Sequence, residues 1–218
     1  MSSPADLPPA RPAATVAIVR DGEAGLEVLL LERSAVGAFA GMWVFPGGRV
    51  DDTDAGADDF ERARTAAVRE AQEEVGLTVD PAALIPWAHW TPPPVQPKRF
   101  NTWFFIAPWS GEEVVVDGHE IVAHQWHAPA RAVEADLPMA PPTLVTLHQL
   151  LGFDRVEQLA DGPALGVERF ATKHAPFEGG AVLMWHGDAG YDAGDPTLPG
   201  PRHRARLDGL RVAGYERG

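Results

Sequence analysis

Cysteine is absent from the sequence, which excludes a disulfide framework, a thiolate nucleophile and a zinc–thiolate site. Long apolar runs are absent as well, and none approaches the roughly 20 residues that a membrane-spanning helix needs. Basic residues are scarce, because 18 Lys and Arg stand against 31 Asp and Glu and give a formal net charge of −13. That charge opposes nucleic acids and anionic membranes but attracts divalent cations. We therefore expect no nucleic-acid partner, no membrane partner and a cytoplasmic location.

The two ends of the chain differ in composition from its middle. Residues 1–12 contain several prolines but no basic-then-apolar leader pattern, so we expect a disordered lead-in there. The 218 residues are enough to bury a substantial core. We assign residues 13–138 to the core of one domain and residues 139–218 to a helical and strand extension of that domain.

Predicted strands and helices are interspersed along the chain. Apolar, β-favouring runs bounded by turn residues predict strands at residues 15–20, 26–32, 43–45, 83–90, 99–107, 120–126, 181–186 and 202–212. A segment rich in Ala, Arg and Glu predicts a helix over residues 58–75, with Asp58 as its N-cap and Gly76 at its end. Shorter helices are predicted at 141–152 and 156–160. This mixture indicates an α/β (α+β) domain.

Three glutamates share one face of the 58–75 helix. Glu70, Glu73 and Glu74 are spaced i, i+3 and i+4, so their side chains project together. Like charges at this spacing destabilise a helix by about 0.2–0.5 kcal/mol per pair, so the cluster needs either open solvent or a cation between its members. A solvated acidic face is the commoner explanation of such a run. The alternative is a site for Mg²⁺ or Mn²⁺, which prefer oxygen ligands.

Two neighbouring features favour the metal site. Gly47 and Gly48 lie upstream, where glycine backbone can approach a metal or a phosphate closely. Arg69 reaches Glu73 four residues further on and can orient its carboxylate. The pattern Arg-Glu-x-x-Glu-Glu-x-Gly is also rare, and at average residue usage it arises by chance in about one chain in several thousand.

These residues resemble the Nudix box, in which a glycine, five residues and a Glu are followed by seven residues and Arg-Glu-hydrophobic-x-Glu-Glu-x-Gly-hydrophobic. The stretch from Glu61 to Leu77 matches this pattern in register. The departure is upstream, because residues 49–60 place twelve positions between Gly48 and Glu61 where the box has five. We interpret this acidic insert as a longer loop before an intact site.

The resemblance implies a Nudix-type α/β/α sandwich around a mixed β-sheet, and hydrolysis of a diphosphate linkage with Mg²⁺ or Mn²⁺. The metal ions would neutralise the diphosphate and lower the pKa of a bound water. The implied metal-binding residues are Gly48, Glu70, Glu73 and Glu74, of which Glu73 and Glu74 also count as catalytic. Glu61 and Arg69 are implied to support the site structurally.

A further carboxylate precedes the predicted strand at residues 120–126. Glu120 ahead of a strand that ends in Trp126 resembles a stretch that brings another carboxylate to the metals in many family members. Glu120 is therefore a candidate catalytic residue, either as a ligand or as the general base. His119 is open as a base or a bystander, and a polar entry to the strand is the plain alternative for both.

Residues outside the box set the choice of diphosphate. The stretches 29–34, 41–48 and 90–105, together with the long loop, resemble a branch of the family that includes coenzyme A diphosphatases. A separate coenzyme A signature is matched at Arg33-Ser34 and from Gly41 to Gly48, but the arginine expected between these parts is absent. Coenzyme A or an acyl derivative is the preferred substrate, while ADP-ribose, NADH and dinucleotide polyphosphates stay open.

Candidate substrate contacts lie just before and within the 99–107 run. Lys98 and Arg99 are basic residues in a half of the chain that has few, and we expect them to contact a phosphate. Trp90 and Phe100 are candidates to stack on a base, although alternation along the strand equally predicts core positions. The basic stretch 202–206 is more typical of a solvated strand face than of a phosphate site.

Two alternatives complete the sequence-based interpretation. A Nudix-type domain that senses a nucleotide without cutting it belongs to a different class, and the complete set of box carboxylates disfavours it. The residues after Met139 exceed what the core sandwich needs. They are open as the interface of a homodimer, as a lid over a small nucleoside diphosphate derivative, or as both.

Overall fold

A large mixed β-sheet forms the centre of the molecule in the computed structural model, which describes residues 9–37, 39–94, 99–135, 137–163, 166–209 and 211–218. Its strands follow the order β3-β2-β1-β6-β5-β8, with β4 paired to β1 and β7 paired to β2. Pairs β1–β6 and β5–β8 are parallel, and the other pairs are antiparallel. The strands are β1 (Arg11–Gly22), β2 (Gly25–Arg33), β3 (Trp43–Val44), β4 (Gly47–Arg49), β5 (Ile85–Thr91), β6 (Phe100–Pro108), β7 (Ile121–His127) and β8 (Glu168–Ala171).

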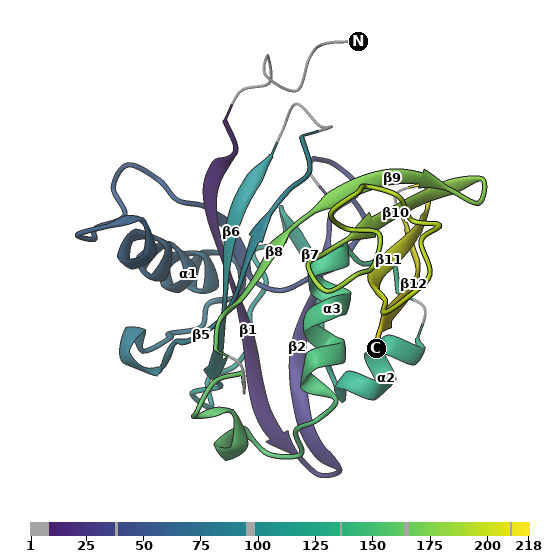
Figure 1. The fold of residues 1–218 in the computed structure, drawn as a ribbon. Coiled ribbons are helices and arrows are strands. Elements are labelled where there is room, and N and C mark those ends of the chain that lie inside the picture. Colours follow the sequence, from purple (N-terminus) through teal and green to yellow (C-terminus); the bar gives the residue numbers. More distant parts are fainter. Residues whose placement is uncertain (1–8, 38, 95–98, 136, 164–165, 210) are drawn as a thin grey trace.

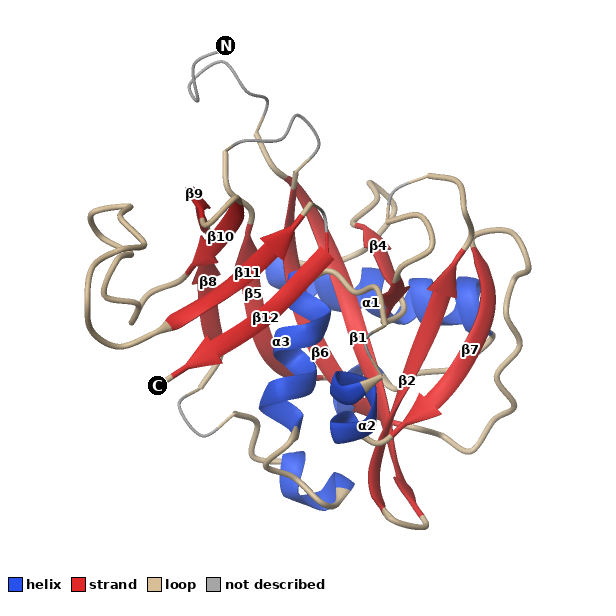
Figure 2. Cartoon of the chain, turned by 90° about the vertical axis from the view of Figure 1, so that its right-hand side faces the viewer, coloured by secondary structure: helices blue, strands red, loops and turns tan. Residues whose placement is uncertain are grey.

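Different elements cover the two faces of this sheet (Figure 1). Helix α1 (Asp59–Val75) covers one face, and α2 (Pro129–Glu134) and α3 (Pro141–Leu150) lie on the other. A second, antiparallel sheet in the order β12-β11-β10-β9 stands beside α3 (Figure 2). It contains β9 (Lys173–Phe177), β10 (Gly180–Met184), β11 (His203–Asp208) and β12 (Arg211–Arg217), and short 3₁₀ turns lie at Pro81–Ala83 and Val156–Leu159. The expected α+β sandwich around a mixed sheet is confirmed.

Strand alternation divides the hydrophobic core into two layers. Successive residues of β6 point to opposite faces, so Phe104 packs in the layer with α3 and Phe105 in the layer with α1. Small side chains let α1 approach the sheet closely, because its buried stripe is made of Ala63, Ala66, Ala67 and Ala71. The carboxylate helix is therefore fixed rigidly against the sheet.

The ends of α1 follow the sequence prediction. The Asp58 side chain accepts a hydrogen bond from the Glu61 amide at 2.9 Å, which satisfies one of the free N–H groups of the first turn. Gly76 ends the helix with a φ of 69°, a left-handed conformation that glycine adopts without a steric penalty. This cap directs the chain away from α1 immediately after Glu74 and Val75.

Two expectations need correction. Arg11 and Pro12 lie in β1 and not in a disordered lead-in. The single strand expected at 202–212 is a hairpin of β11 and β12, with a turn where Gly209 has a φ of 62°. The segment after residue 139 contributes to the central sheet, because β8 pairs with β5.

None of the helices in the described part of the chain is long and apolar enough to cross a membrane.

Candidate metal centre

The three glutamates of α1 differ sharply in exposure. Glu74 points toward the sheet and its side chain is 5% exposed, whereas the Glu70 side chain is 15% exposed. Glu73 lies at the solvent rim with a side-chain exposure of 58%. The helix therefore presents an inner pair of carboxylates and an outer one.

Glu74 is a buried acid at the edge of the sheet. Its Oε2 accepts a hydrogen bond from the Gly47 amide at 2.9 Å, and its Oε1 lies 3.4 Å from Nη1 of Arg33. Burial raises the pKa of this carboxyl to about 8, against the lowering effect of the Gly47 amide, and the Glu70 carboxylate raises it further. A cation held at this position would remove that penalty.

Gly48 provides the close approach that the cluster needs. Strand β4 pairs with β1, with Gly48 opposite Ala14, and this places the glycine against α1. A Cβ at Gly48 would overlap the Glu70 carboxylate, so a larger residue there would force this side chain out of its position. The pKa of Glu70 is raised by burial, even though Arg69 donates to its Oε1 at 2.9 Å.

Arg69 ties α1 to the loop that follows β4. Its Nε and Nη2 donate to Asp54 at 3.0 and 3.1 Å, and Nη2 also donates to the Arg49 carbonyl at 2.9 Å. Its Nη1 donates to Glu70 and, at 2.8 Å, to Glu73. The hydrogen bonds to Asp54 raise the pKa of Arg69 most, so the guanidinium stays charged and holds both carboxylates in place.

Asp54, and not Glu61, holds Arg69. The Glu61 side chain is exposed, and no hydrogen bond or ion pair joins it to Arg69 among the described residues. The Asp54 side chain is 2% exposed; burial alone would raise its pKa, but Arg69 and the Asp51 amide lower it. The supporting role expected for Glu61 is corrected accordingly.

The position of Asp54 explains why the sequence pattern missed it. Five residues, 49–53, separate Gly48 from Asp54, which is the spacing of the Nudix box. Asp replaces the expected Glu, and the additional residues lie between this acid and Arg69 instead of between Gly48 and the acid. A search for a glycine, five residues and either acid would have found Asp54.

Glu120 lies immediately before β7, close enough to Glu74 for its negative charge to raise the pKa of that carboxyl. Asp117 fixes the preceding turn, because its side chain accepts hydrogen bonds from the amides of His119, Glu120 and Ile121. The Asp117 amide in turn donates to the Glu74 carbonyl at 3.1 Å, which attaches the turn to the end of α1. The Glu120 side chain is 65% exposed and pairs with Arg33, and His119 is exposed beside it.

The donor set fits a hard divalent ion. In the part of the chain that the structure describes, no three His, Asp or Glu side chains converge into a complete metal cage. Mg²⁺ does not need one, because it is typically held by one or two carboxylates while waters and substrate phosphates fill the other positions. Glu70 and Glu74, two carboxyl groups whose pKa values are raised by burial, lie beside glycine backbone and supply such a partial set.

The structure places the expected substrate contacts in different environments. Trp90 is 4% exposed, and its ring stacks on Phe170 at 3.8 Å between centroids, so it is a core residue and not a substrate contact. Phe100 begins β6 and is partly exposed, opposite Arg11 of β1 and at the same end of the sheet as Gly48. The Arg99 carbonyl accepts a hydrogen bond from the Arg11 amide at 2.8 Å. Lys98 lies outside the described residues.

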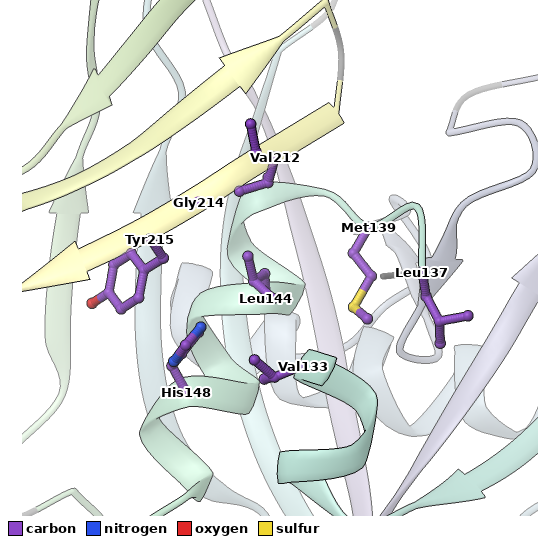
Figure 3. Close-up of a pocket in the computed structure, with 9 residues that line it drawn as sticks. Val133, Leu137, Met139, Leu144, His148, Val212, Gly214 and Tyr215 are labelled. Atoms are coloured by element: carbon purple, nitrogen blue, oxygen red, sulfur yellow. The ribbon is translucent and has the colours of Figure 1, made fainter. Parts of the chain in front are cut away.

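A separate cavity of about 160 Å³ lies on the face of the sheet away from α1 (Figure 3). Its lining residues come from α2, the α2–α3 connection, α3 and β12; many of their side chains are aliphatic, but polar atoms make up more of the cavity surface than apolar ones. Met139 at its edge forms a β-bridge with Trp43, four residues before Gly47. The cavity and the carboxylates thus flank the same short segment of chain.

With this geometry established, the comparisons with known proteins identify the family. The NUDIX domain profile matches residues 9–150, more than half of the chain. The chain belongs to the NUDIX domain family. The acyl-coenzyme A diphosphatase NUDT19 of Xenopus laevis is 29% identical over 133 residues, which cover 55% of this chain and 35% of that protein. The chain thus spans only about a third of that relative's length.

Solved structures agree on the fold. A NUDIX hydrolase from Alicyclobacillus acidocaldarius superposes with a TM-score of 0.64 at 24% identity, and the match covers 72% of this chain and 98% of that one. The NUDIX domain of Shewanella oneidensis NrtR, solved with ADP ribose, gives a TM-score of 0.54 at 16% identity over 69% and 92% of the two chains. At these identities the likeness concerns the fold alone.

Proposed function

We propose that this protein is a divalent-metal-dependent hydrolase that cleaves the diphosphate linkage of a nucleoside diphosphate derivative. The observation that carries the proposal is the buried Glu74 carboxyl, held by the Gly47 amide beside Glu70 and destabilised in its charged form. Strongly perturbed acids of this kind are typical of functional sites. Membership of the NUDIX family supports the same reaction class.

The roles of the residues follow from their placement. Glu70 and Glu74, with the Gly48 carbonyl, would hold Mg²⁺ or Mn²⁺, and Glu73 would join them from the rim. The metal, when bound, supplies charge neutralisation and a more acidic bound water. Water adds to one phosphorus, the bond from that phosphorus to the bridging oxygen breaks, and two phosphate monoesters leave. Arg69 keeps the ligands oriented through its contacts to Asp54.

The proton of the attacking water goes to an exposed carboxylate in this proposal. Glu73 and Glu120 both lie at the solvent rim, with side-chain exposures of 58% and 65%. A general base must reach the proton within hydrogen-bond distance of the bound water, and exposed side chains have the freedom to do so. A Gln variant of the true base is expected to lose the acidic limb of the kcat–pH profile, which distinguishes Glu73 from Glu120. His119, exposed beside Glu120, is the third candidate.

Coenzyme A or an acyl-coenzyme A is the substrate that we place first. The 29% identity to acyl-coenzyme A diphosphatase NUDT19 and the partial coenzyme A signature support it. The cavity of about 160 Å³ beside Met139, which several aliphatic side chains line, is the place that we propose for the acyl arm. Arg99 and Phe100 at the same end of the sheet as Gly48 are the proposed contacts to the nucleotide.

Other functions remain as ordered alternatives. ADP-ribose, NADH or a dinucleotide polyphosphate would use the same metal centre. A non-catalytic nucleotide sensor ranks below every hydrolase, because Glu70, Glu73 and Glu74 are all present. A homodimer and a lid role for the C-terminal segment are further proposals that size measurement and truncation test.

The decisive experiment is a screen of diphosphate compounds with Mg²⁺ and with Mn²⁺, in which both products are identified by mass. Coenzyme A and acyl-coenzyme A of increasing chain length are compared with ADP-ribose, NADH and dinucleotide polyphosphates. We expect cleavage of coenzyme A compounds into two phosphate monoesters, with a preference that changes with acyl length. Binding of any of these compounds without turnover under either metal would contradict the hydrolase and favour the sensor.

A further inference from the structure

Arg33 reaches the metal centre because the backbone at the end of β2 is fixed. Strand β2 pairs with β7, and an irregularity between Glu32 and Arg33 places Arg33 opposite Ile121. The next amide, of Ser34, donates to the Glu120 carbonyl at 2.8 Å. The Arg33 side chain is thereby placed beside Glu120, on the strand edge that faces the end of α1.

The Arg33 guanidinium lies between the two carboxylates. Its Nη2 is 2.7 Å from Oε2 of Glu120, and its Nη1 is 3.4 Å from Oε1 of Glu74. The side chain is only 14% exposed. Its buried Nε has no hydrogen-bond partner among the described residues. Arg33 is thus a largely buried cation, and at least its Nε donor is unused.

One oxygen of Glu74 accepts no backbone hydrogen bond. Oε2 accepts the Gly47 amide, whereas Oε1 is the oxygen that Arg33 contacts. A divalent ion bound at Oε1 would lie beside the guanidinium and would repel it. The ion and Arg33 therefore compete for Glu74.

We propose that Arg33 is an internal counter-cation that a divalent ion displaces from Glu74 and Glu120, and that the released guanidinium then binds the diphosphate of the substrate. The proposal rests on the proposed function. It gives a reason for the unused Nε, because a planar guanidinium with free donors matches two phosphate oxygens at once. Arg33 is a positioning residue for the carboxylates in one state and a substrate-binding residue in the other.

The first test measures Mn²⁺ binding by the full chain without substrate. Arg33→Met is expected to bind Mn²⁺ roughly tenfold more tightly than the wild type, because the competitor is gone. Arg49→Met is the matched control, since it removes a positive charge from the same sheet edge without touching Glu74 or Glu120. Weaker binding by Arg33→Met, or a change no larger than that of Arg49→Met, would overturn the proposal. Arg33→Gln repeats the test if the Met variant does not fold.

The second test measures binding of methylene diphosphonate, a diphosphate analogue that cannot be hydrolysed, at saturating Mn²⁺. The same Arg33 variants are expected to bind it roughly tenfold more weakly than the wild type, because the fork of donors is lost. Unchanged analogue binding would refute the transfer of Arg33 to phosphate. Failure of the proposed function gives a different result. If the wild type and Glu74→Gln bind Mn²⁺ equally, Glu74 is not a metal ligand and the proposed metal centre itself is wrong.

Discussion

Two arginine–carboxylate clusters of this protein contain similar residues, but the pKa of the buried acid is lowered in one and raised in the other. In the C-terminal sheet, Arg204 donates to both oxygens of Asp188, and its third nitrogen donates to the Pro196 carbonyl. Asp188 also accepts the amides of Gly190 and His203. Burial alone would raise its pKa, but these partners lower it to about 2. At the metal centre, burial instead raises the pKa of Glu74 to about 8.

The difference shows how a finished ion pair can be distinguished from a binding site. The Asp188–Arg204 pair satisfies its own donors and acceptors, and so it fastens the loop between β10 and β11. Glu74 has one weak arginine contact and two neighbouring acids, so its charge is left incompletely compensated. A bound cation would therefore stabilise the charged carboxylates of the Glu74 cluster, whereas the Asp188–Arg204 pair has no need of one.

The largest expected effect is on catalysis. Glu74→Gln removes the charge that holds the metal, and we expect kcat to fall by more than about 100-fold, since even outer-shell partners of metals cost 10–100-fold. Glu134→Gln is the control, because Glu134 is exposed on α2, far from this cluster in sequence. Steady-state kinetics on the substrate found in the screen measures both, and near-wild-type turnover by Glu74→Gln would remove it from the site.

At the Asp188–Arg204 pair, the expected effect of a substitution is a loss of stability. Asp188→Asn leaves Arg204 as a buried charge without its partner, and removing one partner of such a pair costs about 3–5 kcal/mol. Urea unfolding of the metal-free protein measures it, with the exposed Asp192→Asn as the control. If Asp188→Asn unfolds at the wild-type midpoint, the pair is not a fastening and the contrast between the clusters fails.

Asp54 tests the support of the ligands. Asp54→Asn removes the charged partner of Arg69, and we expect metal affinity to fall by about 10–100-fold, as for other outer-shell residues. Glu61→Gln is expected to have a much smaller effect, because its side chain is exposed. Mn²⁺ titration compares them, and the reverse order of the two variants would return the supporting role to Glu61.

The last expected effect is on the pH dependence of stability. The pKa of Glu74 is raised from 4.5 to about 8, so the native state binds more protons than the unfolded state between these values. Its contribution is therefore fully present below pH 4.5 and lost as the pH rises through about 8, by at most about 1.4 kcal/mol per pH unit. Glu74→Gln is expected to lack this loss when unfolding free energies are measured without metal from pH 5 to 9. Parallel curves would contradict the raised pKa.

Much of the central fold was predictable from sequence, because strand alternation and helix capping are local signals. The 58–75 helix, its Asp58 cap and the β1–β2 hairpin all follow from such signals. The C-terminal sheet was less predictable, since its strands are short and one hairpin is hidden within a polar stretch around Gly209. Pairing of β8 with β5 is a long-range contact that no local pattern encodes.

The candidate site divides in the same way. Helical spacing predicted that Glu70, Glu73 and Glu74 share a face, but it did not predict that Glu74 is buried and Glu73 is exposed. That difference depends on how the helix is rotated against the sheet. The roles of Arg33 and Asp54 depend on tertiary contacts across the chain. Burial of Trp90 against Phe170 likewise required the position of β8.

The measurement that tests the central claim most directly is a titration with Mn²⁺, followed by electron paramagnetic resonance of the free ion, on the wild type, Glu74→Gln and Glu134→Gln. The account predicts saturable binding by the wild type and Glu134→Gln that Glu74→Gln lacks. Equal binding by all three chains would contradict the claim that the Glu70–Glu74 edge is the metal centre.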